Sequence, residues 1–448
     1  MQKVTAIVGR NGSGKTLYID QLRKQLASDR VRYIAFTDSY GVNVDGQYYL
    51  QLRWNQHDID HETPTVGELL EKAYKLAGED TEERRKLQAH LYKLFHMEEF
   101  LDKYIIILSS GELRKFQLTK TLFANLKLLI MDNPFIGLDA ETRDQLKELL
   151  SVLTTERDIE VMLVLSKTDD IPEFVSKVIE ITPNGEQVYE TVDDYYAHQQ
   201  PIPAQVLSEE KRQAILNLPY HDNDYDCQKV VEMKDVSIRY GERTILKDVN
   251  WTVMNGDRWA LSGQNGSGKS TLLSLICADN PQAYACDITL FGHQRGSGES
   301  IWDIKKHIGY VSPEMHRSYQ RNLPCLQIVA SGLKDTIGLY TRASEAEKQL
   351  CRWWMWLFGI DHLADRSFLA VSSGEQRLVL LARAFVKDPE LLILDEPMHG
   401  LDAHQQQLVK DIIDTFCLRT NKTLIMVTHY PSELPSCITH QKYLTKQQ

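Results

Sequence analysis

The sequence contains no apolar run that approaches the roughly 20 residues needed for a membrane-spanning helix. Its first residues, MQKVTAIVG, pass directly into an apolar segment, which leaves no room for a secretory signal peptide. The seven cysteines are scattered and form no C-x-x-C pair, which disfavours a zinc site and a disulfide framework. We therefore expect a cytoplasmic protein with reduced thiols.

An excess of positive charge is also missing. The chain carries 51 Lys and Arg against 62 Asp and Glu, and its formal net charge is −11. This balance gives no reason to expect general binding to nucleic acid, which depends on basic side chains that neutralise phosphates. At 448 residues, the chain is long enough for two or three domains, each with its own core.

A glycine-rich segment in the second half carries the strongest signal. Residues Gly263–Thr271, GQNGSGKST, match the phosphate-binding loop pattern G-x-x-x-x-G-K-[ST]. The apolar segment Arg258–Ser262 predicts a strand before the loop, and Leu272–Cys277 predicts the start of a helix after it. Backbone N–H groups of such a loop and the helix N-terminus surround a phosphate. The expected nucleotide-binding residues are Gly263, Asn265, Gly266, Ser267, Gly268, Lys269, Ser270 and Thr271, with Lys269 on the β- and γ-phosphates and Ser270 also on Mg²⁺.

A second copy of this loop lies near the start of the chain, as GRNGSGKT. Two further segments recur: LSSGELRK at 108–115 against VSSGEQRL at 371–378, and LLIMDNPFIGLD at 128–139 against LLILDEPMHGLD at 391–402. Lys269 minus Lys15 is 254, and both later segments are offset by 263 residues. The chain is therefore predicted to be a tandem duplication. The first copy adds as nucleotide-binding residues Gly9, Asn11, Gly12, Ser13, Gly14, Lys15 and Thr16.

Apolar strand-like and amphipathic helix-like segments alternate in both copies, which predicts an α/β fold with a parallel sheet that binds phosphate at its carboxyl edge. Thr65–Phe100 has helical spacing. We expect a first domain at 1–195, a linker at 196–228 with a short helix at Ser208–Leu218, and a second domain at 229–448. Only the second copy has strand-like segments before its loop, at Val230–Arg239, Thr244–Lys247 and Val249–Val253.

The order of these motifs resembles that of the ATP-binding cassette (ABC) ATPases: a phosphate loop, L-S-x-G-[EQ], an apolar strand that ends in Asp-Glu, G-L-D, and a His after a strand. Within that superfamily the chain is similar to the tandem-cassette ModF group, also called PhrA or photorepair-like, which is associated with molybdenum transport. The similarity is strongest in ITLFGHQRGSGESIWDIKKHIGYVS at Ile288–Ser312. It implies two nucleotide-binding domains, each with a RecA-like core and a helical subdomain, and a first domain without the N-terminal antiparallel strands.

The resemblance also implies how the units cooperate. Two cassettes pair head to tail, and each ATP lies between the phosphate loop of one unit and the LSSGE-like motif of the other. A serine hydroxyl and glycine N–H groups at a helix start suit that role, because they form a second anion cradle. The residues expected in these two motifs are Ser109 and Gly111 in the first unit, and Ser372 and Gly374 in the second.

The second phosphate loop is predicted to serve the hydrolytic site. Asp395 ends an apolar strand and is expected to position Mg²⁺ together with Ser270, while Glu396 is expected to orient or deprotonate the attacking water. His429 resembles the switch histidine that contacts the γ-phosphate, and Tyr240 resembles the aromatic residue that stacks on adenine. Taken singly, each of three residues has an ordinary interpretation: Glu396 as a surface carboxylate, His429 as a strand-end cap and Tyr240 as a strand aromatic.

The first phosphate loop is predicted to serve a degenerate site. Asn133 stands where the other copy has Glu396, and an amide cannot accept a proton from water at neutral pH. We also place Lys167 opposite His429. Thr16 and Asp132 remain as expected Mg²⁺ ligands. The hypothesis is that this site binds ATP and hydrolyses it slowly or not at all; the alternative is that both sites turn over.

One expected feature of the better site is missing. Many cassettes carry a glutamine that contacts Mg²⁺ and water, but the second unit has Ser312, Pro313 and Glu314 in that loop. Gln51 is our candidate for this metal-contacting glutamine in the first unit, and Gln56 is the alternative. The aromatic run RWWMWLFGI at 352–360 is expected to be mainly core, with a groove for a partner helix as the other interpretation.

These features predict an ATPase that requires ATP and Mg²⁺. One hypothesis is that it energises or regulates a membrane importer, with molybdate as the candidate substrate, through separate transmembrane permease subunits at the inner face of the plasma membrane. Another is a soluble regulator or mechanoenzyme that acts on ribosomes or nucleic acid. Tandem cassettes that bind ribosomes usually carry a long, charged helical arm between their two units. The linker of this chain is short and mildly acidic, which argues against the second hypothesis. A nucleotide sensor with little turnover is a third.

Overall fold

The computed structural model describes residues 4–26, 30–35, 64–105, 108, 110–124, 126–135, 138, 140–156, 159–166, 171–199, 201–219, 227–240, 243–313, 315, 319, 322–336 and 342–446. The chain divides into two compact units, Met1–Pro201 and Ile202–Gln448. Each unit is described by itself below. Among the described residues, no helix combines the length and the apolarity that crossing a membrane requires.

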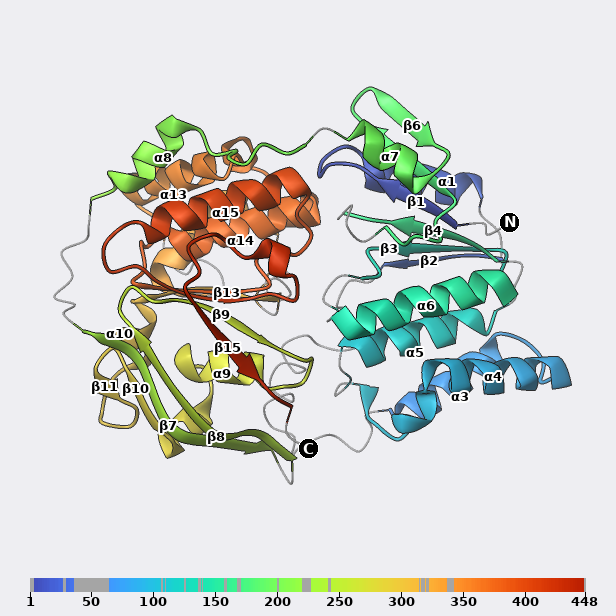
Figure 1. Ribbon diagram of the computed structural model, residues 1–448, viewed down its shortest axis with the longest axis horizontal. Coiled ribbons are helices and arrows are strands. Elements are labelled where there is room, and N and C mark those ends of the chain that lie inside the picture. The colour runs from blue at the N-terminus through green and yellow to red at the C-terminus, as the bar shows by residue number, and fades with distance from the viewer. Residues whose placement is uncertain are drawn as a thin grey trace. The chain divides into compact units, whose positions relative to one another are not determined.

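The first unit is built on a six-stranded sheet with the order β2-β3-β4-β1-β5-β6 (Figure 1). All neighbouring strands are parallel except β5 and β6, which form an antiparallel edge. The strands are β1 Val4–Val8, β2 Val31–Ala35, β3 Leu128–Asp132, β4 Glu160–Val164, β5 Lys177–Thr182 and β6 Gly185–Tyr189.

Helices cover both faces of this sheet, as the nearly continuous apolar runs of its inner strands require. Ala6, Met131 and Leu163 face a large core shared with α5 and α6, whereas Ile7, Ile130 and Val164 face a smaller core under α1. Figure 1 shows α5 and α6 together on one side of the strands, with α3 and α4 beyond them. The helices are α1 Lys15–Gln25, α3 Val66–Leu76, α4 Glu82–Phe95, α5 Ser110–Leu122, α6 Ala140–Glu156 and α7 Val192–His198, with a 3₁₀ turn at Met97–Glu99.

The helical segment predicted at Thr65–Phe100 is two helices rather than one. Thr65 and Glu68 form a capping box that starts α3. The helix ends before Gly78, whose φ of 149° lies outside the helical region. The Thr81 side chain then accepts a hydrogen bond from the N–H of Arg84 and caps α4. The sequence predicted one helical segment because the apolar residues keep helical spacing on both sides of this break. The caps interrupt the helical backbone without changing that spacing.

The second unit contains two sheets. A five-stranded parallel sheet has the order β12-β13-β14-β9-β15, and a four-stranded antiparallel sheet has the order β11-β10-β7-β8. The two segments predicted at Thr244–Lys247 and Val249–Val253 form one strand, β8, because irregular pairing with β7 absorbs Asp248 at a φ of 47°. The strands are β7 Lys229–Tyr240, β8 Arg243–Met254, β9 Arg258–Gly263, β10 Asp287–Leu290, β11 His293–Gln294, β12 Ile308–Val311, β13 Leu391–Asp395, β14 Thr423–Val427 and β15 His440–Leu444.

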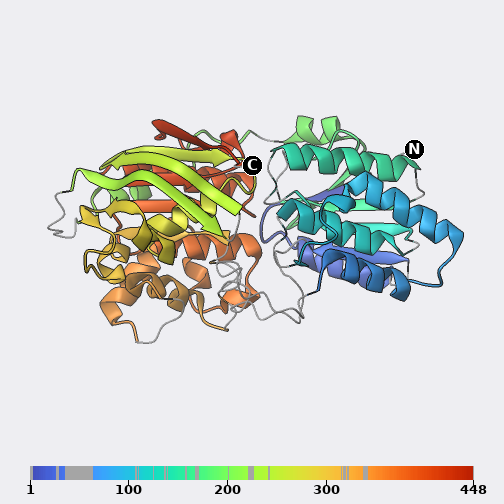
Figure 2. The ribbon, with the colours of Figure 1, turned by 90° about the horizontal axis from the view of Figure 1, so that it is seen from below.

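The parallel sheet of the second unit lies between two cores. Leu392 and Met426 face helices α12 to α15, whereas Ile393 and Val427 face α9 and the antiparallel sheet. The long yellow-green strands β7 and β8 lie side by side in Figure 2. The helices are α8 Glu209–Leu216, α9 Lys269–Ile276, α10 Ile301–Lys305, α12 Cys325–Ser331, α13 Glu345–Leu357, α14 Ser373–Phe385 and α15 Ala403–Cys417.

Two predictions on organisation can be compared with this architecture. The described part of the first unit has no counterpart of the sheet β11-β10-β7-β8, as the resemblance implied. In the aromatic run, Trp354 and Phe358 are buried in the core, which confirms the main interpretation for these two residues. The predicted linker limits of 196 and 228 stay a prediction. Within that range, α8 packs against α15, and Ile215 is fully buried in the second unit's core.

Candidate nucleotide-binding sites

The two glycine-rich loops have the same backbone conformation. Each connects an interior strand of its sheet to a helix, β1 to α1 and β9 to α9. The three glycines have φ values of 147°, 79° and 95° in the first loop and 151°, 79° and 92° in the second. A Cβ on Gly9 or Gly263 would lie 2.4 Å from a backbone carbonyl oxygen of the neighbouring strand, so only glycine fits at the start of either loop.

Both loops also place a lysine in the same way. Lys269 Nζ donates to the carbonyls of Gly263 at 2.6 Å and Gln264 at 3.0 Å. Lys15 Nζ donates to the carbonyls of Gly9 at 2.5 Å and Arg10 at 3.0 Å. In each loop the ammonium group therefore lies across the turn, next to the helix N-terminus, where positive charge and backbone N–H groups favour an anion.

A buried serine hydroxyl in each loop supports the fit of the loops to phosphate. Ser267 Oγ and Ser13 Oγ are both buried and have no hydrogen-bond partner among the described residues. A buried hydroxyl without a partner costs about 1–3 kcal/mol, so a phosphate oxygen there would remove a penalty. No cluster of three or more acidic, His or Cys side chains that could hold a metal occurs in the described ranges. Mg²⁺ fits such a site nevertheless, because it takes one or two protein ligands and phosphate oxygens.

The surroundings of the two loops differ. A Cβ on Gly268 would meet Leu246 at 2.7 Å and the carbonyl of Ile245 at 3.1 Å, because β8 packs against this turn. Among the residues that the structure describes, a Cβ on Gly14 would meet nothing within 4 Å. As a result, Lys269 is 9% exposed, whereas Lys15 is only partly buried. The antiparallel sheet thus encloses the second loop.

The strand end of the second unit gathers the predicted catalytic groups. Asp395 closes β13 and is 6% exposed, and Glu396 follows it in the left-handed conformation with a φ of 53°. The N–H of Glu396 donates to the carbonyl of Val427 at 2.9 Å, which ties the turn to β14. Burial raises the pKa of Glu396 well above its usual value; Asp395 and Glu433 add to this, and Lys269 opposes it. A raised pKa suits a carboxylate that takes a proton from water.

His429 lies against this carboxylate. Its Nε2 is 3.3 Å from Oε1 of Glu396, and both side chains are largely buried. The Thr428 hydroxyl donates to the buried Glu433 carboxylate, and the N–H of Tyr430 donates to Thr428 Oγ1 at 3.1 Å. The loop that carries His429 is therefore held on both sides of the imidazole. The structure brings Asp395, Glu396 and His429 together with Lys269 in one unit.

The first unit uses the equivalent position differently. Asn133 has a φ of 51°, and its N–H donates to the carbonyl of Val164 at 2.8 Å, as Glu396 does to Val427. Its Nδ2 donates to Asp132 Oδ1 at 2.9 Å, and its Oδ1 accepts from the N–H of Ser166 at 2.8 Å. The Tyr33 hydroxyl donates to the other Asp132 oxygen at 2.8 Å. The Asn133 side chain therefore joins two strand ends instead of facing an imidazole.

The strand register corrects the position assigned to Lys167. Asp132 pairs with Val164, and Asp395 pairs with Val427, so residues in these two segments correspond at an offset of 263. His429 then corresponds to Ser166, and the assignment of Lys167 was wrong by one residue. The sequence left this open because the apolar strands slide by one position without losing their pattern. Lys167 itself lies outside the described residues.

Sequence reasoning missed a buried arginine beneath the catalytic turn. Arg377 is 1% exposed and donates to the carbonyls of Ser312 at 3.2 Å, Asp395 at 2.7 Å and Pro397 at 3.3 Å, and also to that of Glu396. Burial lowers its pKa to about 10. It therefore fixes the backbone of both carboxylates. A sequence signal for this arginine was present, because Arg114 and Arg377 occupy the same position after the two SSGE segments.

The LSSGE-like motif of the second unit begins a helix. Ser372 caps α14 in a capping box with Glu375, with Ser372 N–H to Glu375 Oε2 at 2.7 Å and Glu375 N–H to Ser372 Oγ at 3.3 Å. Gly374 is buried in the first turn. In the first unit Gly111 lies in the first turn of α5, and Ser109 lies outside the described residues, as do Gln51, Gln56 and Glu314. Pairing of either motif with the opposite loop stays a prediction.

Tyr240 ends β7, beside the phosphate-loop helix. Its hydroxyl accepts a hydrogen bond from Asn280 Nδ2 at 3.0 Å, and Asn280 also donates to Ser274 of α9 at 3.3 Å. These bonds hold the partly buried ring next to the helix that follows the loop. Its proposed stacking on adenine stays a prediction. The other predicted binding residues, Asn11, Gly12, Thr16, Asn265, Gly266, Ser270 and Thr271, all lie in the two loops or the first turn of the following helix.

Comparison with known proteins agrees with this geometry. The family described as ABC transporter matches residues 1–136 and 246–399. The chain is 35% identical to the ABC transporter ATP-binding protein ModF of Escherichia coli, over 97% of this chain and 90% of ModF. It is 27% identical to an uncharacterized ABC transporter ATP-binding protein of Schizosaccharomyces pombe, over 98% of this chain and 91% of that protein.

Solved structures show the same fold. An RNase-L inhibitor structure covers 99% of this chain with a TM-score of 0.56, and the chain covers 83% of it at 17% sequence identity. A ribosome-bound archaeal Pelota and ABCE1 structure covers 96% of this chain with a TM-score of 0.60, and the chain covers 70% of it at 18% identity. Two phosphate loops, two strand-end aspartates and these similarities lead to one conclusion. The chain belongs to the ATP-binding cassette family, as an ATP-binding protein with two cassettes in tandem that is similar to ModF.

Proposed function

We propose that this tandem cassette binds ATP at two unequal sites and hydrolyses it at the second phosphate loop. Lys269 and the loop N–H groups hold the β- and γ-phosphates. Asp395 and Ser270 would hold Mg²⁺, which would neutralise phosphate charge. Glu396 takes the proton of the attacking water, and His429 orients that carboxylate and contacts the γ-phosphate. The LSSGE-like motif of each unit covers the loop of the other unit.

One observation carries the proposal: the same left-handed turn holds a buried Glu396 in one unit and Asn133 in the other. Glu396 has the raised pKa that a general base needs, and His429 lies 3.3 Å away. Asn133 cannot accept a proton and is already bonded through both its amide groups. Loss of a general base typically costs a factor of about 10²–10⁴ in rate. The first loop is therefore proposed to retain ATP, with Lys15, Thr16 and Asp132 as its ligands.

Steady-state hydrolysis tests this assignment. We expect Glu396→Gln to lower kcat at least 100-fold, and Asn133→Gln, the matched amide change in the other unit, to lower it less than threefold. Both purified variants should still bind ATP, since neither change touches a phosphate loop. If Glu396→Gln kept about half of the activity, the two sites would be equivalent and the proposal would fail.

The cellular role we favour is the energising or regulation of a membrane transporter at the inner face of the plasma membrane, with molybdate as the candidate substrate. Its support is the similarity to ModF over nearly the whole length of both chains. A transporter role requires separate permease subunits as partners. The test is cross-linking of the tagged chain in its native cells, followed by identification of membrane proteins. A permease captured by the wild type in an ATP-dependent manner supports the role.

The second candidate is a soluble regulator or mechanoenzyme on ribosomes or nucleic acid. The fold shared with the RNase-L inhibitor and archaeal ABCE1 structures favours it only at the level of architecture, because the identities are 17–18%. Salt-washed ribosomes and single-stranded RNA discriminate the two roles. Stimulation of the ATPase rate by either one, without a permease partner in cross-linking, would favour this candidate over the transporter.

A further inference from the structure

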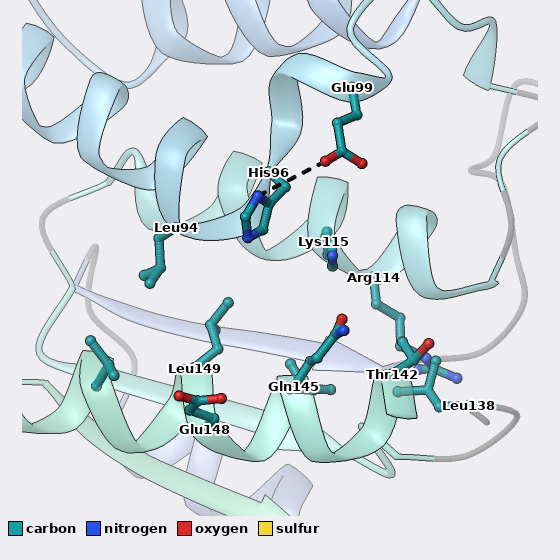
Figure 3. A pocket seen from close by; sticks show the side chains of 12 residues that line it. Leu94, His96, Glu99, Arg114, Lys115, Leu138, Thr142, Gln145, Glu148 and Leu149 are labelled. Atoms are coloured by element: carbon teal, nitrogen blue, oxygen red, sulfur yellow. Dashed lines mark ion pairs between the residues drawn. The ribbon is translucent and has the colours of Figure 1, made fainter. Parts of the chain in front are cut away.

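The first unit contains a groove that neither nucleotide site uses. It has a volume of about 500 Å³ and lies between the end of α4, helix α5 and helix α6. Figure 3 shows Leu94 and His96 on one side, Gln145, Glu148 and Leu149 of α6 on the other, and Lys115 between them. Its base is apolar, since Leu146 and Leu149 are 6–7% exposed.

The duplication identifies the same groove in the second unit. From Thr81 to Ser166 the two units correspond at an offset of 263, which pairs the helix caps Thr81 and Ser344 and the buried Phe95 and Phe358. The turn after each helix is also shared, since His96 and Gly359 have φ values of 52° and 71°. By this correspondence, Leu94 and Glu148 of the groove match Leu357 and Asp411.

In the second unit, residues 202–218 fill this groove. The N–H groups of Val206 and Leu207 donate to Asp411 Oδ2 at 2.6 and 2.9 Å. In the first turn of α8, Lys211 Nζ donates to the carbonyls of Trp356 at 2.5 Å and Leu357 at 3.3 Å, at the end of α13. Leu207 and Ile215 are 3% and 0% exposed and belong to the core of this unit. An extended lead and a short amphipathic helix thus close the second groove.

The first groove retains the groups that make these contacts. Glu148 supplies a carboxylate at the position where Asp411 accepts two N–H groups in the second unit. The backbone carbonyls at the end of α4 correspond to the carbonyls at the end of α13 that accept from Lys211. Both Glu148 and Lys93 are exposed, and Leu94 is only half-buried. One position differs in character: Lys115 stands where the second unit has the buried Leu378.

We propose that this groove of the first unit docks an amphipathic helix of a partner protein, preceded by an extended lead like that of residues 202–218. The lead places two N–H groups on Glu148, a basic side chain meets the carbonyls at the end of α4, and an acidic side chain meets Lys115. The occupant is not the equivalent segment of a second copy, because that segment is already held by Asp411 and buries Leu207 and Ile215 in its own unit.

The test uses a labelled synthetic peptide of residues 202–218 as a stand-in for the partner helix, added to the full chain and followed by fluorescence anisotropy. We expect saturable binding to the wild type that weakens at least tenfold in Glu148→Lys. Glu148→Asp, which introduces the residue of the second unit, should keep the wild-type affinity. Glu173→Lys is the matched control, since Glu173 is an exposed acid of the same unit away from the groove. Thermal unfolding and ATP binding show that each variant is folded.

Three results would overturn the proposal. The first is no binding to the wild type at millimolar peptide, and the second is equal binding to Glu148→Lys and the wild type. The third is a concentration-dependent dimer, seen by sedimentation, that Glu148→Lys abolishes, because the occupant would then be a second copy. A failed ATPase assignment affects neither readout, since the groove contains none of the proposed nucleotide ligands.

Discussion

The two phosphate loops of this chain are nearly identical, whereas the strand ends that face them are not. The loops share glycine conformations within a few degrees and the same lysine contacts. At the strand ends, Glu396 meets an imidazole, whereas Asn133 bonds to Asp132 and to the backbone of Ser166. The difference separates binding from chemistry: the loop geometry that binds phosphate is retained in both units, and the proton acceptor is retained in one.

The surroundings of the loops follow the same division. In the second unit, β8 packs against Gly268 and shields the loop, whereas no described residue of the first unit packs against Gly14 in this way. Enclosure strengthens electrostatic interactions at a site, because water is displaced. Enclosure, the raised pKa of Glu396 and a nearby histidine thus occur in the same unit. At the corresponding described positions the first unit has Asn133 and Ser166, and its buried strand-end carboxylate with a raised pKa is Asp132.

The largest contrast is expected between the two loop lysines. Lys269→Ala should lower kcat at least about 100-fold, because it removes a positive charge from the developing charge of the transferred phosphate. Lys15→Ala should lower kcat less than tenfold and act mainly by removing ATP from the first site. Steady-state rates of the purified variants measure both effects. Equal losses would show that the two sites share the chemistry.

Removal of the Tyr240 ring should have the next largest effect. Stacking of a base on an aromatic side chain contributes about 1–3 kcal/mol, so Tyr240→Ala should weaken ATP binding at the second site about 5- to 150-fold. Tyr240→Phe is the control, since it keeps the ring and loses only the hydroxyl bonded to Asn280. Equilibrium titration with a fluorescent ATP analogue resolves the two sites. Unchanged affinity in Tyr240→Ala would remove this residue from the adenine site.

A smaller effect, on stability, tests the structural role of Asn133. Asn133→Asp replaces the donor to Asp132 by a second carboxylate, and the two like charges cannot both remain ionised without cost. We expect the first unit to lose about 1–3 kcal/mol of unfolding free energy, with a lower Tm by calorimetry. Asn184→Asp, in the exposed turn between β5 and β6, should leave Tm unchanged. Equal Tm values for both variants would contradict the hydrogen bonds assigned to Asn133.

The smallest expected effect is a pH-dependent gain in stability. Because the folded-state pKa of Glu396 is raised above 4.5, the folded chain binds more protons than the unfolded chain, and stability falls as pH rises through that window. Glu396→Gln should therefore raise Tm at pH 8, and the gain should shrink toward pH 5. Asn133→Gln has no titrating group and should change Tm equally at both values. A gain independent of pH would show that Glu396 is already ionised in the folded state.

The sequence predicted the parts of the sites that depend on local segments. Glycine spacing is sufficient to define a phosphate loop. Asp395 ends a strand with a clear apolar pattern, and Glu396 follows it. Each of these residues acts through its own backbone and its nearest neighbours along the chain. This is why the two loops and the difference between Glu396 and Asn133 could be predicted without coordinates.

The remaining features depend on register and packing between distant segments. The correspondence of Ser166 with His429 required the hydrogen bonds between β3 and β4, since an apolar strand alone does not specify its register. The carbonyls around Arg377 come from two segments far apart in the sequence, Ser312 and Asp395–Pro397, and no local pattern brings them together. Residues 202–218 have the composition of a linker. Their Leu207 and Ile215 are nevertheless buried, because they pack into the core that α13 and α15 form far along the chain.

The most direct test of the account counts nucleotides after one turnover. The wild-type chain is mixed with radiolabelled ATP and Mg²⁺, separated rapidly from free nucleotide, and analysed for ADP and ATP per chain. Unequal sites predict one ADP and one intact ATP per chain in the wild type, and two intact ATP in Glu396→Gln. Two ADP per wild-type chain would contradict the account, because Asn133 would then not prevent hydrolysis at the first site.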